Sequence, residues 1–177
     1  MAMNRLALLT PFKHRDFRLY WLGFVTSVSG MQMFLVVQAW LVYDLTGSAL
    51  QLGFLALFRA IPAVALGLVG GVFADKVDQR RLLIGTTASV ACVYLVLGVV
   101  TLTGVVQVWH ILGSVFIIGG LQAFDQPSRQ AIFPSLINRE DMMSAVALNS
   151  TIHPGTRIFA PILAGLLIDY VGIPRQG

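Results

Sequence analysis

Charged residues are scarce in this sequence, and their scarcity argues against an ordinary water-soluble domain. Asp, Glu, Lys and Arg make up 11% of the 177 residues, whereas they make up about a quarter of typical soluble domains. By contrast, 56% of the residues are hydrophobic and the mean hydropathy is +0.79. The only cysteine, Cys92, excludes an intrachain disulfide. We therefore expect lipid to surround most of the chain.

Recognisable catalytic and metal-binding motifs are also lacking. The three histidines, His14, His110 and His153, are widely spaced, no Walker-type glycine loop precedes a Lys-Ser or Lys-Thr pair, and no nucleophile elbow is present. Anionic cytoplasmic headgroups account for the net charge of +4 without nucleic acid. We predict a protein that is not an enzyme, needs no cofactor or metal and binds no nucleic acid.

Long apolar runs are abundant. A helix needs about 20 apolar residues to cross a hydrocarbon core about 30 Å thick, because lipid cannot satisfy backbone polar groups. The sequence therefore predicts an all-α membrane protein, with a cytoplasmic segment at 1–18, a membrane domain at 19–171 and a truncated end at 172–177. The expected helices cover about 19–43, 50–73, 82–103, 108–129 and 145–171.

The lysines and arginines predict how these helices are oriented. Basic residues precede the first expected helix and occur between the second and third and between the fourth and fifth, whereas loops 44–49 and 104–107 contain none. By the positive-inside rule, the N-terminus is cytoplasmic and the protein is a multi-pass protein of the cell membrane. Near that terminus, Phe12 and Phe17 are expected to enter the headgroup layer.

A charged loop follows the second apolar run, in the stretch "GGVFADKVDQRRLL" at 70–83. Gly67, Gly70 and Gly71 are expected to let helices approach closely. The stretch resembles the signature loop of the major facilitator superfamily, with Asp78 in place of the usual glycine. The residues that match the signature, and are implied to act in gating, are Gly71, Asp75, Lys76, Arg80 and Arg81.

The resemblance extends along nearly the whole chain and is strongest to the enterobactin-exporter-like branch of drug efflux permeases. It rests on "FRLYWLGFVTSVSGMQMFLVVQAWLVYDLTGSALQLG", "FRAIPAVALGLVGGVFADKVDQRRLL" and "AFDQPSRQAIFPSLINREDMMSAVALNSTIHPGTRIFAPILAGLL". It implies twelve helices in two six-helix halves, with substrate bound between the halves and access alternating across the membrane. Five helices are then most of the N-terminal half.

This resemblance implies secondary active transport: efflux of small amphipathic compounds, drugs or siderophores, driven by the proton gradient. The implied partners are the lipid bilayer, a small-molecule substrate and the missing C-terminal half, to which Asp75 would latch. Within the chain, the candidates for a proton carrier are Asp44 and Asp125, near opposite ends of the membrane domain, and His153, the deep histidine. Two alternatives stay open: a non-transporting truncated protein or assembly partner, and an importer of an anionic solute.

Two sets of charges are candidates for function. Asp125 and Arg129 near the cytoplasmic end of the fourth helix are expected to form an inner-face charge cluster with Asp75 and Arg80, or to be an ordinary pair one helical turn apart. Arg59 and Arg157 lie deep inside the second and fifth helices, where an arginine usually faces a cavity, a counter-charge or a pathway. Their partners are either in the missing half or on an anionic or polar substrate, with snorkelling to headgroups as the alternative.

The fifth helix has its own pattern. Its glycines and proline are expected to let it bend, and "GTRIFAPILAG" resembles a loose version of the fifth-helix signature of exporters in this superfamily. "SALQLGFLALFRAIP" and "SAVALNSTIHPGTRIFAP" suggest an inverted repeat that relates Arg59 to Arg157. The bend residues are Gly155, Pro161 and Gly165, and further candidates for the cavity wall, or for interhelical hydrogen bonds, are Gln32, Gln38, Trp40, Asn149 and His153.

Overall fold

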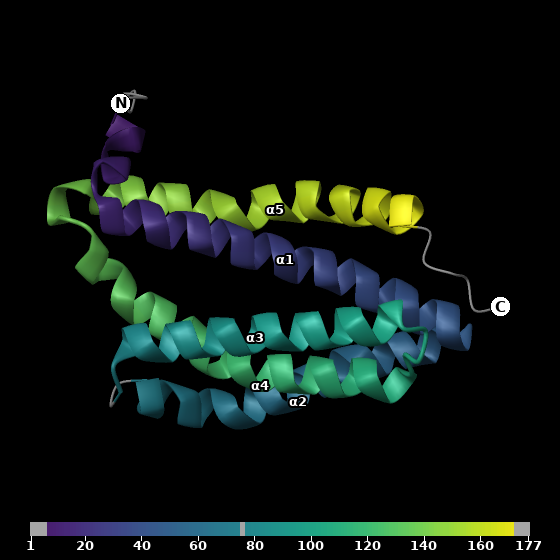
Figure 1. Ribbon diagram of the computed structural model, residues 1–177. Coiled ribbons are helices and arrows are strands. Elements are labelled where there is room, and N and C mark those ends of the chain that lie inside the picture. The colour runs from purple at the N-terminus through teal and green to yellow at the C-terminus, as the bar shows by residue number, and fades with distance from the viewer. Residues whose placement is uncertain (1–6, 75–76, 172–177) are drawn as a thin grey trace. The chain divides into compact units, whose positions relative to one another are not determined.

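The computed structural model describes residues 7–74 and 77–171, and in that part of the chain every regular element is helical. This confirms the all-α prediction. The elements, in chain order (Figure 1), are η1 (Ala7–Lys13), α1 (Arg15–Thr46), α2 (Ala49–Ala74), α3 (Gln79–Leu102), α4 (Val108–Ile132), η2 (Phe133–Leu136), η3 (Arg139–Asp141) and α5 (Met142–Val171).

Within the described residues, four helices are long and apolar enough to cross a membrane: α1, α2 as far as Gly67, α3, and α4 continued through η2. The α5 helix has 30 residues, but Asn149, His153 and Arg157 make its N-terminal half more polar. That α5 also crosses the membrane stays a prediction.

Glycines in the left-handed backbone region end two of the helices. Gly47 has φ 60° and donates its N–H to the Tyr43 carbonyl at 2.8 Å, which closes the end of α1. Gly104 has φ 72° and donates to the Thr101 carbonyl after α3. Because residues with a Cβ are strained in this region, the glycines make short turns possible at both places.

The chain divides into two compact units, which we describe separately. Unit 1 contains η1, the N-terminal part of α1, η2, η3 and most of α5, and unit 2 contains the C-terminal part of α1 with α2, α3 and α4. In unit 1, α1 and α5 pack through Phe24 and Val28 of α1 and Ile152 of α5.

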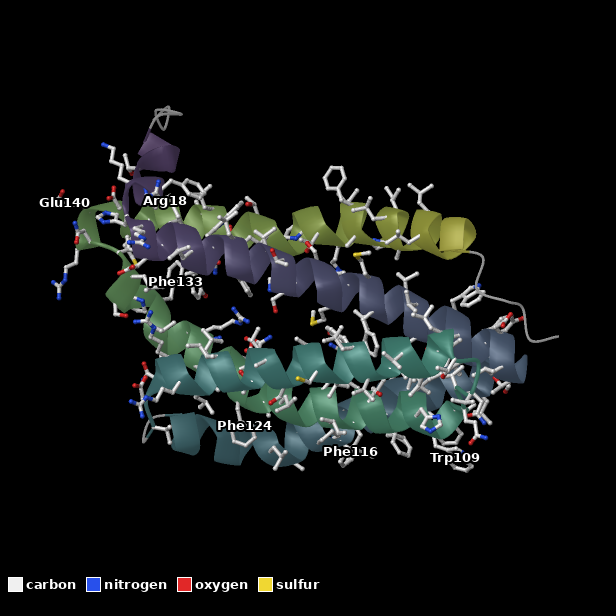
Figure 2. All side chains as sticks on the ribbon, viewed as in Figure 1. Arg18, Trp109, Phe116, Phe124, Phe133 and Glu140 are labelled. Carbon is white, nitrogen blue, oxygen red and sulfur yellow. The ribbon has the colours of Figure 1, made fainter. Side chains whose placement is uncertain are left out.

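Unit 1 also buries an aromatic cluster at the start of α1. Phe17 is 0% exposed and packs with Ile137 and Ala145, while Phe12 and Phe133 contact it edge to face with ring centroids 5.6 and 6.4 Å away. Figure 2 shows Phe133 near the N-terminal end of α1. The prediction that Phe17 enters the headgroup layer is therefore wrong, because the α4–α5 connection covers this side chain with protein.

Unit 2 is a bundle of α2, α3 and α4 (Figure 1). Ile111, Val115 and Ile118 of α4 are almost fully buried in it. Trp109 and Phe116 of the same helix, labelled in Figure 2, are 74% and 44% exposed. Large apolar side chains on an outer surface fit a lipid environment.

Helices α2 and α4 of unit 2 approach each other closely at Gly119 of α4. A Cβ there would lie 2.5 Å from the carbonyl oxygen of Arg59 and 3.0 Å from Cγ of Pro62 in α2. Gly67, by contrast, has nothing within 4 Å of the corresponding position. The prediction of close packing at Gly67 is wrong, and the small residue that permits it lies on the opposite helix. Gly70 and Gly71 are part of α2. What packs against them is outside the described part of the structure, so their role in close packing stays a prediction.

Candidate functional site

The loop before α3 explains the aspartate that stands in place of the usual glycine. Asp78 is the N-cap of α3, and its Oδ1 accepts hydrogen bonds from the backbone N–H groups of Arg80 and Arg81 at 3.0 and 3.3 Å. Its Oδ2 lies 3.5 Å from Nε of Arg81. Aspartate is among the best N-cap residues, because it satisfies N–H groups that have no partner inside the helix.

The remaining signature residues are only partly described. The Arg80 and Arg81 side chains are exposed, and Gly71 is part of the α2 backbone. Asp75 and Lys76 lie outside the described residues. The gating role of these five residues stays a prediction.

Asp125 and Arg129 form a two-point ion pair on α4. Arg129 donates from Nε to Asp125 Oδ2 at 2.6 Å and from Nη2 to Oδ1 at 3.4 Å. The two side chains are only 19% and 12% exposed. Two contacts in a half-buried place hold a guanidinium and a carboxylate more firmly than a single surface contact does.

Two threonines of α3 tie this pair to a second helix. The Thr86 hydroxyl donates to Asp125 Oδ1 at 3.0 Å, and Arg129 Nη2 donates to the Thr87 hydroxyl at 3.4 Å. We call Thr86, Thr87, Asp125 and Arg129 the α3–α4 polar cluster. Sequence reasoning expected Asp75 and Arg80 with the pair and missed both threonines, because threonine in an apolar helix is too common to stand out.

Arg59 has a neutral partner inside this chain. Its Nη2 donates to Oε1 of Gln122 on α4 at 3.1 Å, and Tyr94 on α3 lies in its vicinity. The Arg59 side chain is half-buried. The sequence predicted a partner for Arg59 either in the missing half or on a substrate. The structure shows a partner within this chain, Gln122. We call these three residues the Arg59 node.

In unit 1, the N-terminal segment is held against the α4–α5 connection. His14 Nε2 lies 3.2 Å from Asp141 Oδ2, and both side chains are partly buried. Hydrogen bonds from the Thr10 hydroxyl and from His14 hold the pKa of the Asp141 carboxyl below its ordinary value. A lowered carboxyl pKa means that the contact contributes fully above the ordinary value and weakens as the pH falls through the lowered one.

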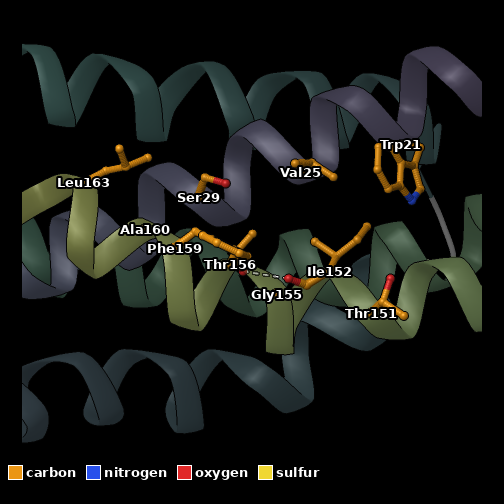
Figure 3. A pocket seen from close by; sticks show the side chains of 10 residues that line it. All are labelled: Trp21, Val25, Ser29, Thr151, Ile152, Gly155, Thr156, Phe159, Ala160 and Leu163. Atoms are coloured by element: carbon orange, nitrogen blue, oxygen red, sulfur yellow. Dashed lines mark hydrogen bonds between the residues drawn. The ribbon is translucent and has the colours of Figure 1, made fainter.

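A groove of about 340 Å³ lies between α1 and α5 in unit 1 (Figure 3). Trp21, Val25 and Ser29 line it from α1, and Gly155, Thr156 and Phe159 line it from α5. Its wall is mainly apolar, and Thr156 turns its hydroxyl hydrogen to the Ile152 carbonyl at 2.8 Å. Such a mixture of aromatic surface and few polar groups suits small amphipathic molecules.

The other candidates differ in their surroundings. Gln32 and Gln38 are buried, and the buried Oε1 of Gln38 and Oδ1 of Asn149 have no hydrogen-bond partner within the described chain. Trp40 is half-buried. His153 and Arg157 are exposed, and the His153 ring meets Phe24 edge to face at 5.7 Å. Their cavity roles stay predictions.

The bend in α5 also stays a prediction. The α5 helix continues through both Pro154 and Pro161 to Val171. Gly155 and Gly165 have nothing within 4 Å of the position that a Cβ would take, so neither is required there by close packing. Among the described residues, no group of three or more His, Cys, Asp or Glu side chains could hold a metal ion.

These features define an all-α, multi-pass membrane protein with charged clusters at helix ends and polar groups between its helices. Comparison with known proteins gives the family: residues 6–175 match the model of the transmembrane secretion effector family. The chain belongs to that family and forms an N-terminal portion of a major facilitator superfamily transporter. No solved structure matches it significantly.

Curated relatives match most of this chain but only part of their own length. Macrolide efflux protein A of Streptococcus pyogenes is 25% identical over 147 residues, which are 83% of this chain and 36% of that protein. The staphyloferrin A transporter of Staphylococcus aureus is 32% identical over 136 residues, 76% of this chain and 34% of that protein. The chain thus spans about a third of the length of the curated relatives it matches.

Proposed function

We propose that the chain contributes the N-terminal helices of a secondary transporter that exports small amphipathic compounds, such as drugs or siderophores, by alternating access. The family match along residues 6–175 carries this proposal. It is supported by relatives named for macrolide efflux. The partners are the lipid bilayer, the transported molecule and a C-terminal half that completes the cavity.

The α3–α4 polar cluster is the best-described candidate for a moving part. In our proposal the two hydrogen bonds that join Thr86 to Asp125 and Arg129 to Thr87 hold α3 and α4 together at the cytoplasmic side in one state, and the Asp125–Arg129 ion pair within α4 orients both charged groups. These contacts rearrange, together with Asp75 and Arg80, when the two halves rock. Proton influx drives the cycle, and Asp125 is a candidate carrier because protonation would remove its attraction for Arg129.

The proposal is tested by following accumulation of the amphipathic dye Hoechst 33342 in bacteria that lack their major efflux pumps. The host expresses the reading frame that contains this chain. We expect lower accumulation than in cells with an empty vector, and loss of the difference when a protonophore collapses the proton gradient. Asp125→Asn, expressed and inserted at the same level, should export poorly.

A matched control and the outcomes that would contradict export complete the test. Glu140→Gln removes an exposed carboxylate in η3, outside the α3–α4 polar cluster, and should export better than Asp125→Asn. Higher dye accumulation than with the empty vector would indicate import. Export would be contradicted if Hoechst 33342, and each macrolide in a panel, accumulated to the same level with and without the reading frame.

A further inference from the structure

The Arg59 node places a positive charge near mid-membrane. Arg59 is ten residues from Ala49, the first residue of α2, or about 15 Å along the helix at 1.5 Å per residue. That is about half of a hydrocarbon core about 30 Å thick. Inserting an arginine at such a depth is unfavourable even on the mildest insertion scale. Its charge therefore calls for compensation.

The described neighbours do not neutralise this charge. Within the described residues, the Arg59 guanidinium has one hydrogen-bond acceptor, the Gln122 amide oxygen, and Tyr94 lies in its vicinity. Both are uncharged side chains at neutral pH. Asp125 is one helical turn along α4 from Gln122, but it forms its ion pair with Arg129, and among the described residues no hydrogen bond or ion pair joins it to Arg59.

The geometry of a guanidinium indicates which ligand would compensate it. Arginine presents five N–H donors in a planar fork that matches the two oxygens of a carboxylate or a similar oxyanion. Gln122 Oε1 accepts from one nitrogen of that fork, and an amide has only one oxygen to offer. The node can hold the side chain in place without using its full capacity for an anion.

We propose that the Arg59 node is a binding site for the carboxylate or sulfonate group of an amphipathic anion. Gln122 holds the guanidinium while the site is empty and gives up its place when the anion binds. Lipid headgroups are a poor source of this anion, because they lie at the ends of α2 rather than near its middle. The inference rests on the proposed function only in taking the bound anion to be the transported molecule.

Equilibrium binding tests the proposal without requiring transport. The product of the reading frame that contains this chain is placed in nanodiscs of zwitterionic phosphatidylcholine. It is titrated with two fluorescent probes, dansyl sulfonate and dansylamide, which share a ring system and differ in charge. We expect at least tenfold tighter binding of the sulfonate. Arg59→Gln should abolish this preference, whereas Arg59→Lys, which keeps the charge, should retain part of it.

Two further variants keep the result interpretable. Arg139→Gln changes the net charge of the chain equally, but at an exposed residue in η3, and should leave the preference unchanged. Gln122→Leu removes the competing acceptor and should keep or strengthen sulfonate binding. Circular dichroism establishes that each variant retains its helices.

The contrary results are equally clear. Equal affinity of the parent chain for both probes, or an undiminished preference in Arg59→Gln, would overturn the proposal. So would loss of the preference in a folded Gln122→Leu variant, because the guanidinium is then still present. Competition of phosphatidylglycerol with the sulfonate would assign the site to lipid headgroups instead. Failure of dye export, by contrast, would contradict the proposed function and leave this binding result intact.

Discussion

A single residue, Asp78, shows how a departure from a family pattern can have a local structural reason. The superfamily signature usually has glycine at this place, and both glycine and aspartate are accepted as N-caps. Here the carboxylate bonds two N–H groups at the start of α3. Aspartate therefore stabilises the start of α3.

The capping role predicts different effects for two substitutions at Asp78. Asp78→Ala should lower the free energy of unfolding by about 0.5–2 kcal/mol, whereas Asp78→Gly should lower it by only a few tenths. Unfolding in mixed micelles, followed by helical circular dichroism, measures both. Hydrogen exchange of the Arg80 and Arg81 amides should speed up in the alanine variant. Equal stability of the alanine variant and the parent would contradict the capping role.

At the scale of helices, Gly119 determines how closely α2 and α4 pack. Gly119→Ala places a methyl group against the Arg59 carbonyl, a backbone atom that cannot rotate away. We expect a loss of about 1–3 kcal/mol, as for other overpacked sites, and weakening of the hydrogen bond between Arg59 and Gln122. The measurement is unfolding in mixed micelles.

Gly113 provides the matched control on the same helix. It has nothing within 4 Å of a Cβ position, so Gly113→Ala should be neutral or stabilising by up to about 1 kcal/mol, because alanine favours helix more than glycine does. If both alanine variants unfold alike, the α2–α4 contact does not limit stability.

The helices themselves could be predicted from the sequence, but their contacts could not. Apolar length predicted five helices, and the turn glycines Gly47 and Gly104 separate two pairs of them. In α3, Leu97 is 6% exposed whereas Leu95 is 69% exposed. Because a lipid-facing surface is as apolar as a buried one, residue type does not distinguish the two faces.

The candidate site was predicted unevenly for a related reason. Asp125 and Arg129 stood out as charges in an apolar context, and they lie together. The sequence does not show which side chain an uncharged polar residue will contact. For this reason Thr86, Thr87 and Gln122 were missed. Phe17 was misplaced because aromatic residues among basic ones are typical of a membrane interface. The same pattern also fits a cluster of aromatic side chains that is buried in protein next to the interface, as here.

At the scale of the whole chain, a contact within unit 1 supports the number of membrane crossings. The N-terminal segment contacts the α4–α5 connection through His14 and Asp141, 3.2 Å apart. Four membrane-spanning helices between these two points return the chain to its starting side. The four helices α1 to α4 that are long and apolar enough to span satisfy this condition, whereas three or five would not.

Four crossings place the α3–α4 turn and the α4–α5 connection on opposite sides of the membrane. Labelling of single cysteines can test this. In a Cys92→Ala background, Thr103→Cys lies in the α3–α4 turn and Ser135→Cys in η2, and both positions are exposed. A membrane-impermeant maleimide should label Thr103→Cys in intact spheroplasts. Ser135→Cys should react only after permeabilisation, because basic residues keep its side cytoplasmic. The opposite pattern would place the N-terminus outside, and labelling of both without permeabilisation would contradict four crossings.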